Sequence, residues 1–161
     1  MYKRILLASD GSGESLVALR EGALIAKALQ AEVFLLIIEP DTPGRRMADG
    51  VYPTPRDPHT GELLQRGLAR LARLGVSASG EVMTGEPPVA IAARARRFTA
   101  DLIVVGHRRQ SLLERWWSGA SGAYLVDNVT CSVLVARNVI TDEEFETHLA
   151  AAAATETLVT I

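Results

Sequence analysis

Residues 104–121 place arginines between an apolar run and an expected helix start. The segment reads VVGHRRQSLLERWWSGAS, and its arginines are Arg108, Arg109 and Arg115. Guanidinium groups make bidentate, charge-assisted hydrogen bonds with phosphate oxygens. The first amides of a helix, here expected from about residue 118, also attract anions because they carry the positive end of the helix dipole. The segment therefore predicts a site for a phosphate group or a similar anion.

A second loop with polar residues follows the first apolar run. Asp10-Gly11-Ser12-Gly13 comes directly after Lys3–Ser9. Ligands of open parallel sheets bind beyond the carboxyl ends of the strands, where the strand order reverses. If the strands that precede Asp10 and Gly106 are neighbours, both loops face one crevice. The alternative role of Asp10 is structural, because aspartate often caps the first turn of a helix through an Asx turn.

Alternating apolar runs and helical patterns predict how these loops are positioned. Nearly continuous apolar runs, typical of strands buried on both faces, occupy residues 3–9, 32–38, 101–105 and 131–136, and residues 77–84 form a more polar edge strand. Helical periodicity predicts helices over residues 15–29 and 60–74. A third helix is expected to start at Pro87 and to bury Ile91, Ala92 and Ala95, and a fourth is expected over about residues 118–128. This order predicts one α/β domain, residues 1–138, with a doubly wound five-stranded parallel sheet and helices on both faces.

Two segments fall outside this regular alternation. Residues 39–58 contain five prolines and are expected to form a lid, a binding loop or a disordered segment. Residues 139–161 are expected to form a C-terminal helix and strand extension. In it, Thr141 and Glu144 form a capping box for an alanine-rich helix with Phe145 and Leu149 on one side. The last residues, 157–161, read as a strand that adds to a sheet edge, in the same or another subunit.

Composition narrows the class of protein. With 161 residues, 48% of them apolar, the chain can build one hydrophobic core. A net charge of −2 provides no overall field for nucleic acid or a membrane surface, and no run is long enough to span a bilayer. The first residues lack the sections of a signal peptide, so a cytoplasmic location is expected. Cys131 is the only cysteine, which excludes an internal disulfide, and we expect a buried structural thiol.

The order of the motifs resembles the universal stress protein family. The resemblance runs from Lys3 through Arg137, in ILLASDGSGES, GEPPVAIA, ADLIVVG and CSVLVAR. It implies a Rossmann-like sheet of the adenine nucleotide alpha hydrolase type, in which the first and fourth strands lie side by side. It also implies homodimers, formed here through the last strand and the tail. The family has one branch that binds ATP and one that does not.

In the ATP-binding branch the motif is Gly, two residues, Gly, nine residues, Gly, then Ser or Thr. This sequence keeps Gly106 and Gly119, but Arg109 takes the place of the second glycine and Ala120 that of the hydroxyl residue. Glycine is required only where φ is positive or a ligand leaves no room for a Cβ. The loss at Ala120 removes one donor, and Ser118 or Ser121 is a candidate replacement.

The resemblance also implies which residues contact the nucleotide. Asp10 contacts the ribose or the adenine, and Ser9 beside it belongs to the same site. Ile38 lines the adenine slot. The phosphates meet the motif residues Gly106, Arg108, Arg109, Gly119, Ala120 and Ser121.

Three functions compete at this point. The favoured one is a stress-response signalling module that binds ATP, with or without Mg²⁺, at an arginine-rich site and engages an unknown protein partner. The alternative is a non-nucleotide-binding dimeric interaction protein that uses Trp116, Trp117 and the tail. The third is an enzyme, because SDGSGES is similar to the phosphate loop of ATP pyrophosphatases. Asp10 stands where that loop needs glycine, so no catalysis beyond slow ATP hydrolysis is expected.

Overall fold

The computed structural model describes residues 1–10, 13–40, 58–106, 120–137 and 140–159. Within these ranges the strands are β1 (Arg4–Ser9), β2 (Glu32–Pro40), β3 (Ala78–Gly85), β4 (Leu102–Gly106) and β5 (Ser132–Ala136). They form a five-stranded sheet in the order β3-β2-β1-β4-β5, and every pairing in it is parallel. The predicted doubly wound sheet is therefore confirmed. The first and fourth strands are neighbours and the polar strand β3 lies at an edge, as predicted.

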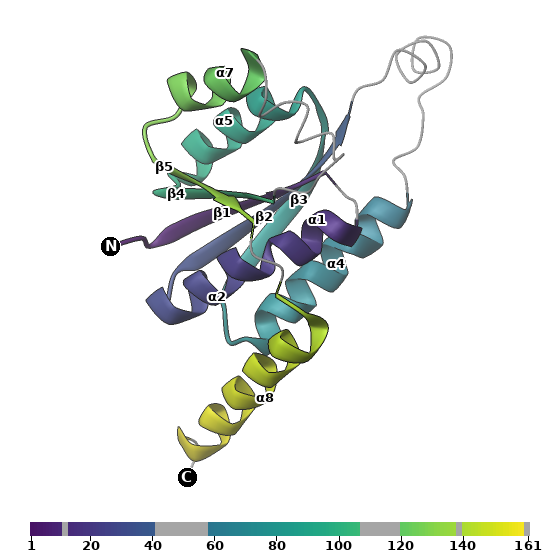
Figure 1. The fold of residues 1–161 in the computed structure, drawn as a ribbon, viewed down its shortest axis with the longest axis vertical. Helices are drawn as coiled ribbons and strands as arrows, with labels where there is room; N and C mark the ends of the chain where they lie inside the picture. Colours follow the sequence, from purple (N-terminus) through teal and green to yellow (C-terminus); the bar gives the residue numbers. More distant parts are fainter. Residues whose placement is uncertain (11–12, 41–57, 107–119, 138–139, 160–161) are drawn as a thin grey trace.

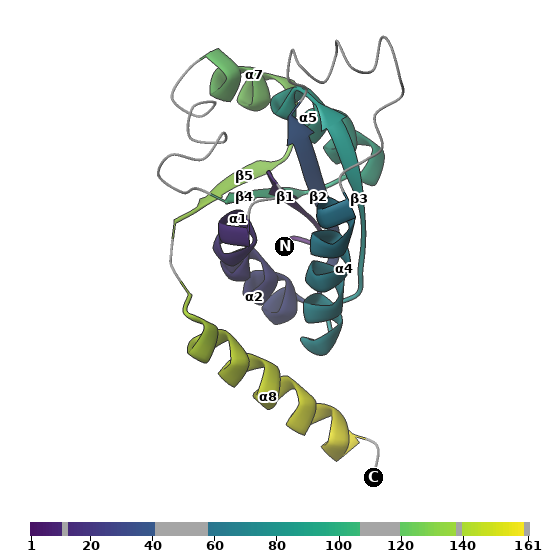
Figure 2. The same ribbon diagram turned by 90° about the vertical axis from the view of Figure 1, so that its right-hand side faces the viewer.

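Helices cover both faces of the sheet (Figure 1). The described helices of one face are α1 (Gly13–Ala18), α2 (Arg20–Leu29) and α4 (Pro58–Arg73). Those of the other face are α5 (Pro87–Phe98) and α7 (Ala120–Asn128). The helix α8 (Asp142–Val159) follows the last strand and runs below α2 and α4 (Figure 2). Across the part of the chain that the structure describes, every helix is too short or too polar to span a bilayer.

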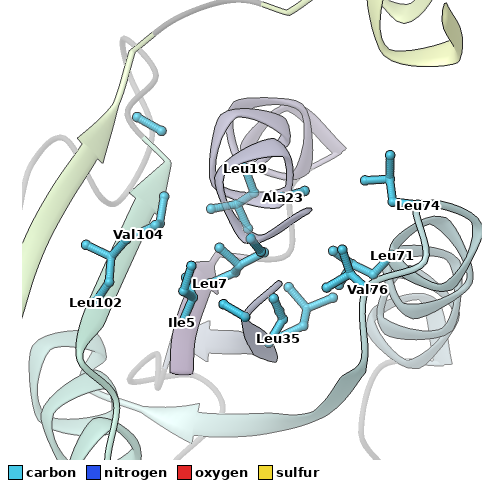
Figure 3. Packing of buried hydrophobic residues seen from close by; sticks show 14 of the residues in the cluster. Ile5, Leu7, Leu19, Ala23, Leu35, Leu71, Leu74, Val76, Leu102 and Val104 are labelled. Carbon is cyan, nitrogen blue, oxygen red and sulfur yellow. The ribbon is translucent and has the colours of Figure 1, made fainter. Parts of the chain in front are cut away.

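Side-chain alternation along the strands divides the core into two halves. Ile5 and Leu7 of β1 face α2 and α4, whereas Leu6 and Ala8 face α5 and α7. Figure 3 shows the first half, where Leu7 of β1 and Leu35 of β2 lie below Leu19, and Leu71 of α4 lies beside them. Because both faces of the central strands are buried, their sequences are nearly continuous apolar runs.

The predicted helix over residues 15–29 is divided at Leu19, which is a turn residue between α1 and α2. Hydrogen bonds from Leu19 N to Ser15 O (3.2 Å) and from Ala23 N to Leu19 O (3.0 Å) still join the two pieces. The apolar period therefore continues through the break. The helix ends at Gln30, which adopts a left-handed conformation with φ 51°.

The third helix agrees with its prediction. α5 begins with Pro87 and Pro88 in its first turn, where a missing N–H breaks no helical hydrogen bond. Ile91, Ala92 and Ala95 are buried against the sheet. The fourth helix, α7, covers Ala120–Asn128, and residues 118 and 119 of its predicted start lie outside the described residues.

The long loop is shorter than its composition predicts. Glu39 and Pro40 still belong to β2, where they pair with Thr84 and Gly85 of β3. Pro58 is the first residue of α4, a position in which proline fits without loss of a hydrogen bond. The rest of the predicted loop, residues 41–57, lies outside the described residues.

The tail begins as predicted but does not end as predicted. Thr141 N donates to Glu144 Oε2 at 2.8 Å and Glu144 N donates to Thr141 Oγ1 at 3.2 Å, which is a capping box. Phe145 and Leu149 are buried, as predicted. The strand prediction for the last residues is wrong, because α8 continues through Val159. A helix satisfies its backbone groups internally, whereas a strand here needs a neighbouring strand to pair with.

Candidate functional site

The carboxyl ends of β1 and β4 lie next to each other and define the candidate site. The strands pair in parallel up to Ala8 opposite Val105. Each strand then has one more residue, Ser9 in β1 and Gly106 in β4. Asp10, the residue after β1, therefore lies at the same edge of the sheet as Gly106. The sequence predicts that the two loops face one crevice if β1 and β4 are neighbours, and the structure shows that they are.

Two buried serines join the end of β1 to the helix that follows it. The hydroxyl groups of Ser9 and Ser15 are hydrogen-bonded to each other, and both residues are almost completely buried. Because Ser15 lies in the first turns of α1, this bond fixes the path of the chain on both sides of residues 11–12 and so positions Asp10. Sequence reasoning did not include Ser15 in the site. Ser15 lies four residues before the buried Leu19, and this helical spacing could have identified Ser15 as a buried residue.

The end of β2 contributes one apolar and one acidic residue. Ile38 is 1% exposed and belongs to the core between the sheet and α5. Glu39 is 6% exposed, and strand alternation directs it to the opposite face of the sheet. Sequence reasoning missed Glu39 as a site residue because it assigned it to the loop.

Only part of the predicted phosphate loop belongs to the described residues. Gly106 ends β4, and Ala120 and Ser121 are the first two residues of α7. Arg108, Arg109 and Gly119 lie outside the described residues, as do the other loop residues that the sequence singles out, Arg115, Trp116, Trp117 and Ser118. The described part thus contains the two ends of the loop, a strand end and a helix start.

The described part of the site offers hydrogen-bonding groups. In the described ranges, no group of three or more His, Cys, Asp and Glu side chains is arranged to hold a metal ion. Cys131 lies far along the chain, directly before β5, and is half-buried rather than fully buried. Burial raises the pKa of its thiol above the usual value. The thiol is therefore protonated at neutral pH and is a poor nucleophile.

The arrangement suits a ligand with hydroxyl groups, an apolar ring and an anionic end. Asp10 accepts hydrogen bonds, Ile38 contributes to the apolar wall of the core beside it, and the amides that open α7 attract negative charge. Asp10 and Ile38 lie at the carboxyl edge of the parallel sheet, where ligands bind in doubly wound folds.

Comparison with known proteins agrees with the fold. Residues 1–137 match the Universal stress protein family. Universal stress protein MJ0531 of Methanocaldococcus jannaschii is 31% identical over 85% of this chain and 83% of its own length.

Solved structures with the same fold include a universal stress protein in complex with cAMP (TM-score 0.60, 21% identity, 86% of this chain and 98% of that one). Another is the universal stress protein from Archaeoglobus fulgidus in complex with dAMP (TM-score 0.58, 19% identity, 84% of this chain and 98% of that one). The family match covers all five strands and the helices between them. The chain therefore belongs to the universal stress protein family.

Proposed function

We propose that this protein is a stress-response signalling module that binds an adenine nucleotide, ATP with Mg²⁺, at the carboxyl ends of β1 and β4. The observation that carries the proposal is the pairing of these two strands, which brings Asp10 to the edge of the sheet where β4 ends at Gly106. The relatives solved with cAMP and dAMP support an adenine nucleotide as the ligand class.

The described residues fit the nucleoside part of such a ligand. Asp10 accepts hydrogen bonds from ribose hydroxyls or from the adenine amino group, and the bond between Ser9 and Ser15 holds the chain before and after it. Ile38, which packs in the core between the sheet and α5, is proposed to lie at the base of the adenine slot. Burial of an aromatic base against such a surface is favourable, and the polar group fixes its orientation.

The phosphates are proposed to lie between Gly106 and the beginning of α7. The amides of Ala120 and Ser121 supply donors at the positive end of the helix. Arg108, Arg109 and Gly119 complete the proposed loop. The motif lacks one glycine and one hydroxyl group in this sequence, and the arginines are proposed to compensate with charge-assisted hydrogen bonds to the phosphates. Bound Mg²⁺ would neutralise part of the phosphate charge.

The proposed role is binding rather than catalysis. Hydrolysis of ATP requires a positioned base or water-orienting residue beside the terminal phosphate, in addition to metal and phosphate contacts. Glu114 is the one acidic residue of the loop between Gly106 and Gly119. We therefore propose that turnover is slow and that the nucleotide state controls the choice of protein partner.

Calorimetric titration with ATP, ADP, AMP and cAMP, with and without Mg²⁺, tests the proposal. ATP is expected to bind with micromolar affinity, equivalent to about −8 kcal/mol. Asp10→Asn should weaken binding at least tenfold. Asp127→Asn makes the same change of charge at an exposed position on α7, near its far end, and should have no effect. Absence of binding by the unmodified protein, or equal affinity of the two variants, would refute the site.

The replaced motif residues favour a second candidate, a dimeric interaction protein without nucleotide. Arg109 and Ala120 stand at two motif positions of the ATP-binding branch. In this case Trp116, Trp117 and the C-terminal tail form the contact surface. Sedimentation analysis of a Trp116→Ala, Trp117→Ala variant separates the candidates. Loss of the dimer with unchanged ATP affinity assigns the loop to assembly, whereas loss of ATP affinity alone assigns it to the nucleotide.

A further inference from the structure

A cavity of about 260 Å³ lies on the face of the sheet that α1, α2 and α4 cover. Leu7 of β1 and Leu35 of β2 form its floor, and Leu19 and Leu63 line its sides. Phe145 of α8 closes one part of it. In Figure 3 the floor residues Leu7 and Leu35 lie below Leu19, and Leu71 lies to their right. The cavity is separate from the strand ends that carry the proposed nucleotide site.

Two small residues on the facing helices line this space. Ala23 of α2 and Gly67 of α4 both line the cavity. A Cβ added at Gly67 would lie 2.5 Å from Leu35 Cδ2, so α4 approaches the sheet closely at this residue. The methyl side chain of Ala23 is too short to fill the space between the two helices. The result is an apolar recess within an otherwise packed core.

The polar groups of the cavity are basic. Arg20, Arg66, Arg70 and His59 line it, and no acidic side chain belongs to its described lining. Arg66 and Arg70 are one helical turn apart on α4 and exposed, so both can turn toward the same anion. Within the described part of the chain, neither arginine forms an ion pair.

Arg20 adds a buried positive charge to the wall. The residue is 4% exposed, its Nη1 donates to Ile140 O at 2.7 Å, and its Nη2 pairs with Asp142. Its Nε is buried and has no hydrogen-bond partner among the described residues. Asp142 is mostly exposed to solvent, so it neutralises the Arg20 charge only in part.

We propose that this cavity binds an amphipathic carboxylate, a medium-chain fatty acid, with its chain against the leucines and its carboxylate at Arg66 and Arg70. The apolar floor excludes ligands that are polar throughout, because it offers them no hydrogen bonds. The basic rim disfavours cationic amphiphiles. The volume lies just below the range of about 300–1,000 Å³ that is typical of pockets for larger organic ligands, so a long-chain lipid does not fit.

Titration with decanoate and octanoate, followed by NMR of labelled methyl groups in the absence of nucleotide, tests the proposal. Decanoate should shift the methyl signals of Leu63, Leu71 and Ala23, and leave those of Ile91 on the other face of the sheet unchanged. Each buried methylene strengthens binding by about fourfold, so octanoate should bind more weakly by roughly fifteenfold. Decylamine, which has the same chain with a positive head, should not bind at the cavity.

Charge reversal on α4 tests the role of the arginines. Arg66→Glu with Arg70→Glu should weaken decanoate binding at least tenfold. Arg96→Glu with Arg97→Glu makes the same change of charge on α5, on the opposite face, and should leave the affinity unchanged.

Absence of decanoate binding, equal shifts with decylamine, or equal affinity of the two charge-reversed variants would overturn the proposal. The methyl shifts of the unmodified protein remain decisive if a variant fails to fold. Neither experiment depends on nucleotide binding.

Discussion

Replacing Phe145 by alanine should release α8 from the domain without unfolding the sheet. Phe145 is 3% exposed, packs in the core that α2 and α4 cover, and lies 5.4 Å from the Arg20 guanidinium, measured to the ring centre. Leu149 is the other large side chain of α8 in this core. Phe145→Ala should cost about 3–5 kcal/mol where the structure cannot relax. Burial of Leu149 supplies only about 1.5–3 kcal/mol, and the pair of Arg20 with the exposed Asp142 adds about 1 kcal/mol at most, so α8 should undock.

Hydrogen exchange of backbone amides, measured by NMR, distinguishes undocking from global unfolding. In Phe145→Ala the amides of α8 should exchange nearly as fast as in an unfolded chain, while those of β1 and β4 stay protected, because a terminal helix can open alone. Ile91→Ala removes a fully buried side chain from α5 and should instead lower the global free energy of unfolding by about 2–5 kcal/mol. His148→Ala, at an exposed position on α8, should change neither. If the amides of α8 and of the sheet lost protection equally in Phe145→Ala, α8 and the sheet would unfold as one cooperative unit, and this reasoning would be refuted.

Three further predictions concern a close contact, the phosphate loop and the capping box. Gly80→Ala would place a Cβ 2.4 Å from a backbone carbonyl oxygen of β2, so chemical denaturation should show a loss of about 1–3 kcal/mol; an unchanged midpoint would contradict this close approach. Ala120→Ser restores a hydroxyl at the first residue of α7 and should tighten ATP binding severalfold in calorimetry, whereas no gain would argue against phosphates at this helix start. Backbone and side-chain hydrogen bonds from Thr141 lower the pKa of Glu144, so its contribution to α8 is complete above its ordinary pKa and is lost as the pH falls through the lowered value. Glu144→Gln should remove that acid transition in the NMR shifts of α8, and its persistence would assign the transition to another group.

The strands and most helices follow from local sequence patterns. Runs such as EVFLLII predict β2, because a strand covered on both faces must be apolar at nearly every position. Thr141 and Glu144 predict the start of α8, because the capping box requires only residues three apart. The end of α8 was predicted wrongly, since residues 157–159 have strand-forming side chains but no strand beside them in the described structure.

The candidate site could be predicted only in part. Asp10 and Gly106 follow apolar runs, and such positions are recognisable without a structure. Glu39 was missed because proline at the next position indicated a loop, although an edge pairing with β3 accepts Pro40. The bond between Ser9 and Ser15 joins a strand to a helix, and helical spacing alone does not show which strand a helix contacts.

The sequence by itself determined the alternation of strands and helices, the buried faces of the helices and the two loops that carry polar residues. These features depend on interactions between residues that are near in the chain. Tertiary structure decided that β1 pairs with β4. The periodicity of the sequence left this pairing open, although the family resemblance implied it. It also decided that Arg20, Arg66 and Phe145 line one cavity. Such contacts join distant residues, and they depend on which burial and hydrogen bonding the whole chain can satisfy at once.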